Sequence, residues 1–256
     1  MNIPFLTRRR HTERHNTDNR MVARTDRGLK RSENQDAVLV RELPDGSVVA
    51  AVADGVGGAS GGELASAGAI ESLLAELWVN PCAADAASLY QAVASANAAV
   101  RAKAAERGLE GMATTLVAAV VCDGSAWVAN VGDSRAYLYE AGTLRQLTQD
   151  HSWVAEQVQA GRLTEEEAET NAFRNVITRA VGVAETVETD VSGPIPLPAG
   201  SLLLLCSDGL HRAVSNAAIA GALASGDPGD MADRLIALAN EAGGSDNVSV
   251  VIVRGE

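Results

Sequence analysis

The chain has 256 residues, of which 46% are hydrophobic and 21% charged, a composition typical of a globular protein and too apolar for a disordered one. Its formal net charge of −12 disfavours nucleic-acid binding. Its longest apolar run, residues 116–122, falls far short of the roughly 20 residues that cross a membrane. Three widely separated cysteines, an odd number, indicate a reducing compartment, so we expect a cytoplasmic protein.

The first 21 residues differ in charge from the rest of the chain. They contain Arg8, Arg9, Arg10, Arg14 and Arg20 but only two acidic residues. They lack the apolar stretch of about 7–15 residues that marks a secretory signal. We predict a basic flexible tail over residues 1–21, solvated or, alternatively, used for docking, followed by a single domain over residues 22–256.

The first half of this domain alternates strands and helices. Residues 37–43 and 47–53 are apolar runs joined by Pro44-Asp45-Gly46, which predicts a β-hairpin. A helix is predicted next from an apolar stripe of Leu64, Ala67, Ile70, Leu74, Leu77 and Trp78. The alanine-rich residues 86–107 predict a second helix. Residues 114–122, 126–131 and 135–140, separated by turn sequences, predict a meander.

The second half begins with a change of character. Residues 152–182 are polar and contain a capping box, Thr164 with Glu167, so we predict a small, mobile helical flap. A strand at 202–206, a helix near 216–224, a helix opened by Asp227 and Pro228, and a strand at 248–253 follow. Because helices arrive in pairs between nearly continuous apolar strands, the predicted fold class is α+β, a four-layer αββα sandwich of two antiparallel sheets flanked by helix pairs.

The hairpin register brings two carboxylates together. If Leu43 faces Ser47 across the turn, Asp36 faces Asp54, and directly opposed Cβ atoms lie about 5 Å apart. A divalent cation or protonation of one carboxyl would neutralise the repulsion, while an exposed strand end that tolerates it is the alternative. Without cysteine or histidine zinc motifs, oxygen ligands favour Mg²⁺ or Mn²⁺.

More carboxylates occur at similar places. Asp208-Gly209, like Asp54-Gly55, ends an apolar strand and leads to no returning strand, whereas Asp45-Gly46 and Asp123-Gly124 are explained as hairpin turns. Asp133 and Asp246 also lie next to predicted strands, although Asp133, taken alone, is better explained as a turn residue.

Eight short segments occur in order: RSENQDA, VADGVGGASGGELAS, GMATTLV, VGDSRAYL, LTQDHS, NVITRAVG, LCSDGL and GGSDNVSVV. Together they resemble the metal-dependent type 2C serine/threonine protein phosphatases, especially the bacterial branch, over about residues 22–254. The resemblance implies an αββα sandwich and hydrolysis of phosphoserine and phosphothreonine on proteins by metal-activated water, without a covalent intermediate. It implies two core ions, Mn²⁺ or Mg²⁺, and a third, weaker one.

By this resemblance, six residues hold metal: Asp36, Asp54, Gly55, Asp133, Asp208 and Asp246. Asp54 bridges the two core ions, Asp36 acts through metal-bound water, and Asp133 belongs to the third ion. Arg31 binds the substrate phosphate, so that Arg31, Asp36 and Asp54 form the catalytic set; a surface arginine is the alternative for Arg31.

The resemblance leaves some features open. Val56 stands where many eukaryotic members have a histidine that is a proposed general acid, and His151 is a substitute only if it is not structural. Asn247 either caps a turn or orients Asp246. The expected partners are phosphoproteins and a cognate serine/threonine kinase that the enzyme opposes, without nucleic acid or membrane, and we expect a monomer. A silent phosphoprotein-binding domain and a phosphatase for small esters are the rivals.

Overall fold

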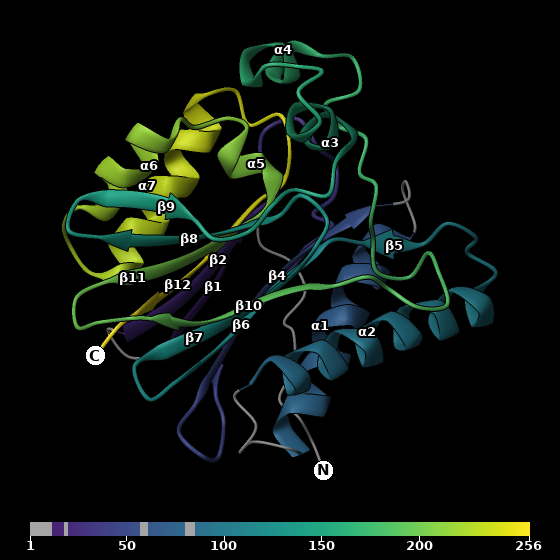
Figure 1. Cartoon of the computed structure of the whole chain (residues 1–256), viewed down its shortest axis with the longest axis horizontal. Coiled ribbons are helices and arrows are strands. Elements are labelled where there is room, and N and C mark those ends of the chain that lie inside the picture. Colours follow the sequence, from purple (N-terminus) through teal and green to yellow (C-terminus); the bar gives the residue numbers. More distant parts are fainter. Residues whose placement is uncertain (1–11, 18–19, 57–60, 80–84) are drawn as a thin grey trace.

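The computed structural model describes residues 12–17, 20–56, 61–79 and 85–256. Two antiparallel sheets pack face to face, and helices cover both outer faces (Figure 1). This arrangement confirms the predicted αββα sandwich. Within the described residues, every helix is too short or too polar to span a membrane.

One sheet has the strand order β1-β2-β12-β11-β8-β9. Its strands are β1 (Thr12–Thr17), β2 (Met21–Asp26), β12 (Val248–Arg254), β11 (Leu202–Cys206), β8 (Arg135–Glu140) and β9 (Thr143–Gln146). The other sheet has the order β10-β7-β6-β4-β3, with β5 paired to β4. Its strands are β10 (Asp190–Pro196), β7 (Ser125–Val131), β6 (Leu116–Cys122), β4 (Val48–Val56), β3 (Asp36–Glu42) and β5 (Ala113–Thr114).

Each sheet is covered on its outer face by a separate set of helices. Helices α1 (Gly62–Val79) and α2 (Ala86–Arg107) cover the sheet that contains β4, while α5 (Asp208–His211), α6 (Asn216–Leu223) and α7 (Pro228–Glu241) cover the other sheet (Figure 1). Helices α3 (Trp153–Gln159) and α4 (Glu165–Thr170) stand together at one end of the sandwich. The predicted capping box of Thr164 and Glu167 begins α4 and is confirmed.

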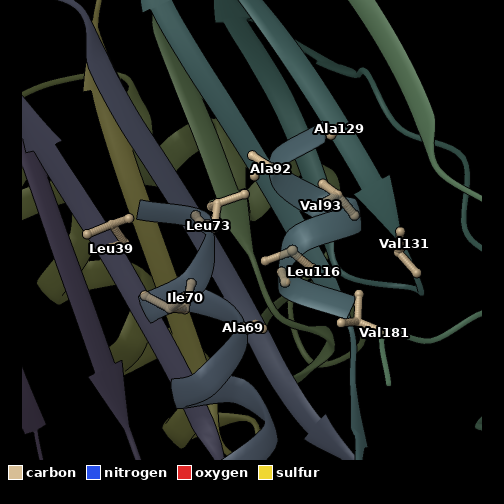
Figure 2. Close-up of a cluster of buried hydrophobic side chains, with 14 of the residues drawn as sticks. Leu39, Ala69, Ile70, Leu73, Ala92, Val93, Leu116, Ala129, Val131 and Val181 are labelled. Atoms are coloured by element: carbon tan, nitrogen blue, oxygen red, sulfur yellow. The ribbon is translucent and has the colours of Figure 1, made fainter. Parts of the chain in front are cut away.

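Strand alternation builds three apolar layers. In β4, Val48, Ala50 and Val52 point between the two sheets, whereas Val49, Ala51 and Ala53 point toward α1 and α2. Figure 2 shows the layer between this sheet and its helices, where Leu73 of α1 and Val93 of α2 pack over Leu116 of β6. Because both faces of the central strands β4, β6, β11 and β12 are buried, their apolar runs are nearly continuous, as the sequence indicated.

Several predictions need correction. Residues 12–17, assigned to the flexible tail, form β1 and pair with β2, so the predicted tail does not extend over them; residues 1–11 and Cys82 lie outside the described residues. Strand β2 was not predicted, because Arg24 and Asp26 interrupt its apolar pattern, yet all six of its residues are buried. On α1 the predicted stripe is confirmed in part, since Ile70 and Leu77 are buried, but it left out the buried Leu73 and included Trp78, which is 42% exposed.

Candidate active site

The β3–β4 hairpin places Asp36 directly opposite Asp54. The Leu43 amide donates to the Ser47 carbonyl at 2.7 Å, and the Gly46 amide donates to the Leu43 carbonyl at 3.0 Å, which closes the turn predicted from the sequence. The register prediction is therefore confirmed. Two carboxylates consequently face each other at one end of the central sheets.

Asp36 is held from the opposite sheet. The hydroxyls of Ser207 and Ser249, beside β11 and in β12, donate to its Oδ2 at 2.8 and 2.6 Å. Its Oδ1 is buried without a hydrogen-bond partner. Burial raises the pKa of Asp36 to about 7, and the charges of Asp208 and Asp246 add to this rise while the two hydroxyls lower it.

Asp54 is fixed by its backbone and surrounded by acids. Its amide donates to the Thr115 hydroxyl at 3.0 Å, and its carbonyl accepts from the Thr115 amide at 2.9 Å. Burial raises the pKa of the Asp54 carboxyl well above its ordinary value, and the charges of the other four aspartates raise it further. These four are Asp36, Asp208, Asp133 and Asp246. The other four predicted carboxylates therefore all act electrostatically on Asp54.

Gly55 lies where the chain approaches the beginning of α1. Its amide donates to the Gln35 carbonyl at 3.1 Å. A Cβ at this position would lie 2.2 Å from the carbonyl oxygen of Gly62, so only glycine fits without a backbone shift. The backbone after Asp54 is thus fixed by packing.

Asp208 begins α5, and Asp246 lies two residues before β12. Arg31 donates to Asp246 Oδ2 at 2.7 Å, and the Arg31 side chain is 53% exposed. Asp208 Oδ2 lies 3.3 Å from Nε of Arg212, while Asp208 Oδ1 is buried without a partner. Burial, with the charge of Asp246, raises the pKa of Asp208, whereas Arg212 lowers it.

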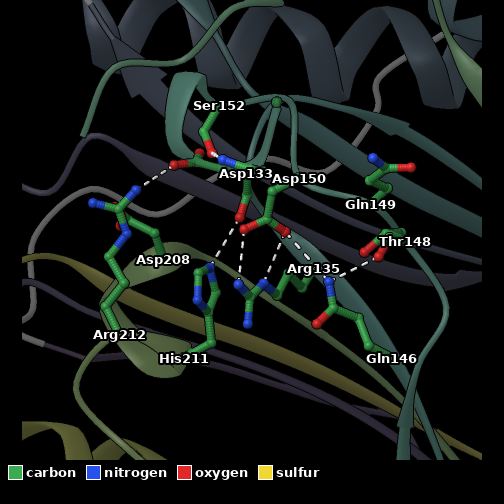
Figure 3. Close-up of polar contacts among 12 residues, drawn as sticks. Asp133, Arg135, Gln146, Thr148, Gln149, Asp150, Ser152, Asp208, His211 and Arg212 are labelled. Atoms are coloured by element: carbon green, nitrogen blue, oxygen red, sulfur yellow. Dashed lines mark hydrogen bonds and ion pairs between the residues drawn. The ribbon is translucent and has the colours of Figure 1, made fainter. Parts of the chain in front are cut away.

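Asp133, in the turn between β7 and β8, is not a solvated turn residue. Its side chain is 5% exposed, and its Oδ2 accepts from Arg212 Nη2 at 2.6 Å. Burial raises the pKa of Asp133 to about 7, as does the charge of Asp208, while Arg212 opposes the rise. His211 Nε2 lies 2.9 Å from the Asp133 carbonyl, which can only accept, so the ring donates. Figure 3 shows these groups together.

The donor set fits hard cations, although the side chains do not close on one ion. The buried, unpartnered oxygens of Asp36 and Asp208 are acceptors that a divalent cation would satisfy. Among the residues that the structure describes, no three His, Cys, Asp or Glu side chains converge as ligands of a single ion. Instead, Arg31 pairs with Asp246, and Arg212 pairs with Asp133 and Asp208.

Two residues left open by the sequence have clear positions. Asn247 Oδ1 accepts from the Gln35 amide at 2.8 Å, and its Nδ2 donates to the carbonyls of Arg27 and Glu33, both at 2.9 Å. It therefore fastens the loop that carries Arg31. His151, 6% exposed, accepts from the Gly132 amide at 3.1 Å through Nδ1, which favours a structural role.

Arg212 and the serines that hold Asp36 were missed. Arg212 follows Asp208 by four residues, a spacing that places both on one side of a helical turn and could have flagged the pair. Ser207 and Ser249 carry no comparable signal, because only the packing of the two sheets brings them to Asp36.

Comparison with known proteins gives consistent matches over most of the chain. A sequence model described as protein phosphatase 2C matches residues 29–242. The serine/threonine phosphatase Stp of Listeria welshimeri is 39% identical over 237 residues, covering 90% of this chain and 93% of that protein.

Two solved structures are similar in fold as well as in sequence. The Mycobacterium tuberculosis serine/threonine phosphatase PstP/Ppp is 40% identical with a TM-score of 0.84, covering 93% of this chain and 98% of its own. The catalytic domain of PstP in complex with two manganese ions is 38% identical with a TM-score of 0.80, covering 92% of this chain and 97% of its own.

Proposed function

Because the chain belongs to the protein phosphatase 2C family and is a protein serine/threonine phosphatase, we propose that its carboxylate cluster holds two divalent cations, Mn²⁺ or Mg²⁺, for the hydrolysis of phosphoserine and phosphothreonine. The observation that carries this proposal is the position of Asp36 opposite Asp54, whose charged form is disfavoured by the charges of four neighbouring aspartates. The complex of PstP with two manganese ions supports the choice of cation.

We assign the ligands as follows. Asp54, on which the other four aspartates act, would be the ligand shared by the two ions, and the Gly55 carbonyl, Asp208, Asp246 and Asp36 would be the further groups that hold them. The raised pKa of Asp54 supports this assignment, because a site of divalent cations makes several adjacent carboxylates tolerable. Two such ions lower the pKa of a water molecule and neutralise charge on the phosphoryl oxygens, so no covalent enzyme intermediate is needed.

Arg31 binds the substrate phosphate. Its guanidinium is half-exposed at the edge of the cluster, and its planar fork suits phosphate oxygens. The loop that carries it is fastened by Asn247, which limits how far the guanidinium can move. Arg31 therefore exchanges Asp246 for the phosphate when substrate arrives.

The proton for the leaving group does not come from a histidine beside the cluster. His151 accepts a backbone hydrogen bond from Gly132, and His211 donates one to the Asp133 carbonyl. Burial lowers the pKa of His211 well below its ordinary value, so this ring stays neutral. Val56, directly after the Asp54-Gly55 pair, has no proton to give.

The enzyme test uses a phosphothreonine peptide with Mn²⁺ present. We expect steady phosphate release by the natural chain and near-complete loss in Asp54→Ala, because that variant loses the shared ligand. Asp45→Ala is the matched control, since this aspartate accepts from Ser47 at the far turn of the same hairpin. Equal release by the natural chain and Asp54→Ala would reject the proposal.

Two further arms separate the rivals. A phosphatase for small esters would hydrolyse free phosphoserine as fast as the peptide. A silent phosphoprotein-binding domain would bind the peptide but release no phosphate at any Mn²⁺ concentration.

We also propose that the enzyme opposes a serine/threonine kinase in the cytoplasm, as a monomer with one phosphatase domain. The odd number of well-separated cysteines supports the location. Sedimentation at several protein concentrations tests the monomer, and dephosphorylation of kinase-labelled cell extract tests the opposition to a kinase.

A further inference from the structure

Arg212 lies between two carboxylates that come from different sheet connections. Its Nη2 lies 2.6 Å from Oδ2 of Asp133, in the β7–β8 turn, and its Nε lies 3.3 Å from Oδ2 of Asp208, at the beginning of α5. The Asp133 and Asp208 side chains are 5% and 16% exposed, and that of Arg212 is 28% exposed. One guanidinium therefore forms ion pairs with two largely buried carboxylates.

The position of Arg212 is fixed by its element. It is the C-terminal cap of α5, and its own amide donates to the Asp208 carbonyl at 3.0 Å. The preceding residue, His211, donates to the Asp133 carbonyl. The same short helix therefore contacts Asp133 twice, through a ring and through a guanidinium, as Figure 3 shows.

We propose that Arg212 is an internal cation that occupies the space between Asp133 and Asp208, so that this phosphatase binds two divalent ions and not three. The proposal rests on the proposed function, because it concerns the same carboxylate cluster. It replaces the expectation that Asp133 is the ligand of a third ion. Asp133 instead anchors Arg212, and Asp208 keeps its unpartnered Oδ1 for a core ion.

The physical reason is charge. Asp133 and Asp208 both contact one guanidinium, so these two largely buried carboxylates lie close enough to repel each other. One positive group between them removes the repulsion. Arg212 is always protonated, and its fork can donate to both acids at once. A further divalent ion at Asp133 would have to displace a tethered guanidinium from a 2.6 Å contact.

The same guanidinium also reaches the flap of residues 152–182. Its Nη1 donates to Oδ1 of Asn175, which lies between α4 and β10. The flap is consequently connected through Arg212 to Asp133 and Asp208.

The test counts bound Mn²⁺ by titration, with the free ion followed by electron paramagnetic resonance up to millimolar concentration. We expect two Mn²⁺ per chain in the natural protein and three in Arg212→Gln, which keeps a polar side chain but removes the charge. Arg212→Lys should stay at two, because it keeps a cation. The double variant Arg212→Gln/Asp133→Asn should return to two, and Arg101→Ala, on the exposed side of α2, should not differ from the natural protein.

Different failures have different meanings. Three Mn²⁺ on the natural protein, or two on a folded Arg212→Gln, would overturn this inference and leave the proposed function standing. No Mn²⁺ on the natural protein would overturn both. If Arg212→Gln does not fold, the count on the natural protein and on Arg212→Lys still decides, because three ions on either contradicts the proposal.

Discussion

Arg31 and Arg212 contact the same cluster of carboxylates, but they are held to different degrees. Arg212 is fixed by a helix cap and by two acids, whereas Arg31 lies in a loop, has a 53% exposed side chain and contacts one acid, Asp246. An exposed ion pair contributes little to stability, because water solvates both partners. Arg31 is therefore free to exchange partners, and Arg212 is not.

This difference predicts the effect of Arg31→Ala. We expect KM for a phosphothreonine peptide to rise roughly 10- to 100-fold, the loss of one charge-assisted contact, with a smaller change in kcat. Steady-state kinetics at saturating Mn²⁺ measures both. Lys30→Ala is the matched control, because Lys30 is the exposed cation next in the chain.

A fall in kcat with unchanged KM would instead place Arg31 in the transition state alone. An equal rise of KM in Lys30→Ala would show that general positive charge, and not this guanidinium, attracts the substrate.

At the scale of elements, Asn247 links three segments. Its side chain makes three hydrogen bonds to the backbone of residues 27–35, the loop between β2 and β3 that contains Arg31. Its carbonyl faces α5 so closely that a Cβ on Gly209 would lie 1.9 Å away. The β2–β3 loop, α5 and the beginning of β12 are thus packed as one unit around the acids.

Asn247→Ala should loosen this unit. Three lost hydrogen bonds, which leave partly buried backbone groups unpaired, predict a decrease of about 2–4 kcal/mol in the free energy of unfolding. Urea unfolding measures the decrease, and amide hydrogen exchange should quicken in residues 27–35 before other regions. A decrease below about 0.5 kcal/mol would contradict the bracing role.

The hairpin shows why part of the site was predictable. Its two-fold period and its turn sequence fix the register, so Asp36 and Asp54 could be paired by counting. The contact of Ser249 with Asp36 and that of Arg212 with Asp133 could not, because they depend on how two sheets and a helix pack, which no local pattern encodes. Only the spacing between Arg212 and Asp208 carried a local signal. Strand β2 was missed for a similar reason, since its Arg24 is paired with Asp233 of α7 at 2.8 Å and thereby buried.

At the scale of the whole molecule, the buried acids make stability depend on pH. The pKa of Asp36 and that of Asp133 are each raised to about 7 from 3.8. At pH values between 3.8 and about 7, the folded protein keeps protons that the unfolded chain releases, so the free energy of unfolding falls as pH rises. His211 opposes this below about pH 6.5, because the unfolded chain protonates it, but one histidine is outnumbered by the acids.

We therefore expect the metal-free protein to be less stable at pH 7.5 than at pH 5. Asp36 and Asp133 each contribute at most roughly 3 kcal/mol to this loss, and less where the acids titrate together. Urea unfolding in a chelator measures the slope, and Asp36→Asn should flatten it because one titrating group is gone. A metal-free protein that gains stability from pH 5 to pH 7.5 would contradict the raised pKa values.

Mn²⁺ should reverse the slope, because cations bind the deprotonated carboxylates that the folded protein otherwise disfavours. At a Mn²⁺ concentration 100 times the Kd, one site adds about 2.7 kcal/mol, and this gain grows with pH as the acids lose their protons. Thermal unfolding with and without Mn²⁺ at pH 5 and pH 7.5 measures the gain. Because Asp54 is the shared ligand in our assignment, Asp54→Asn should raise metal-free stability while losing most of the Mn²⁺ response, a combination that a purely structural aspartate would not produce.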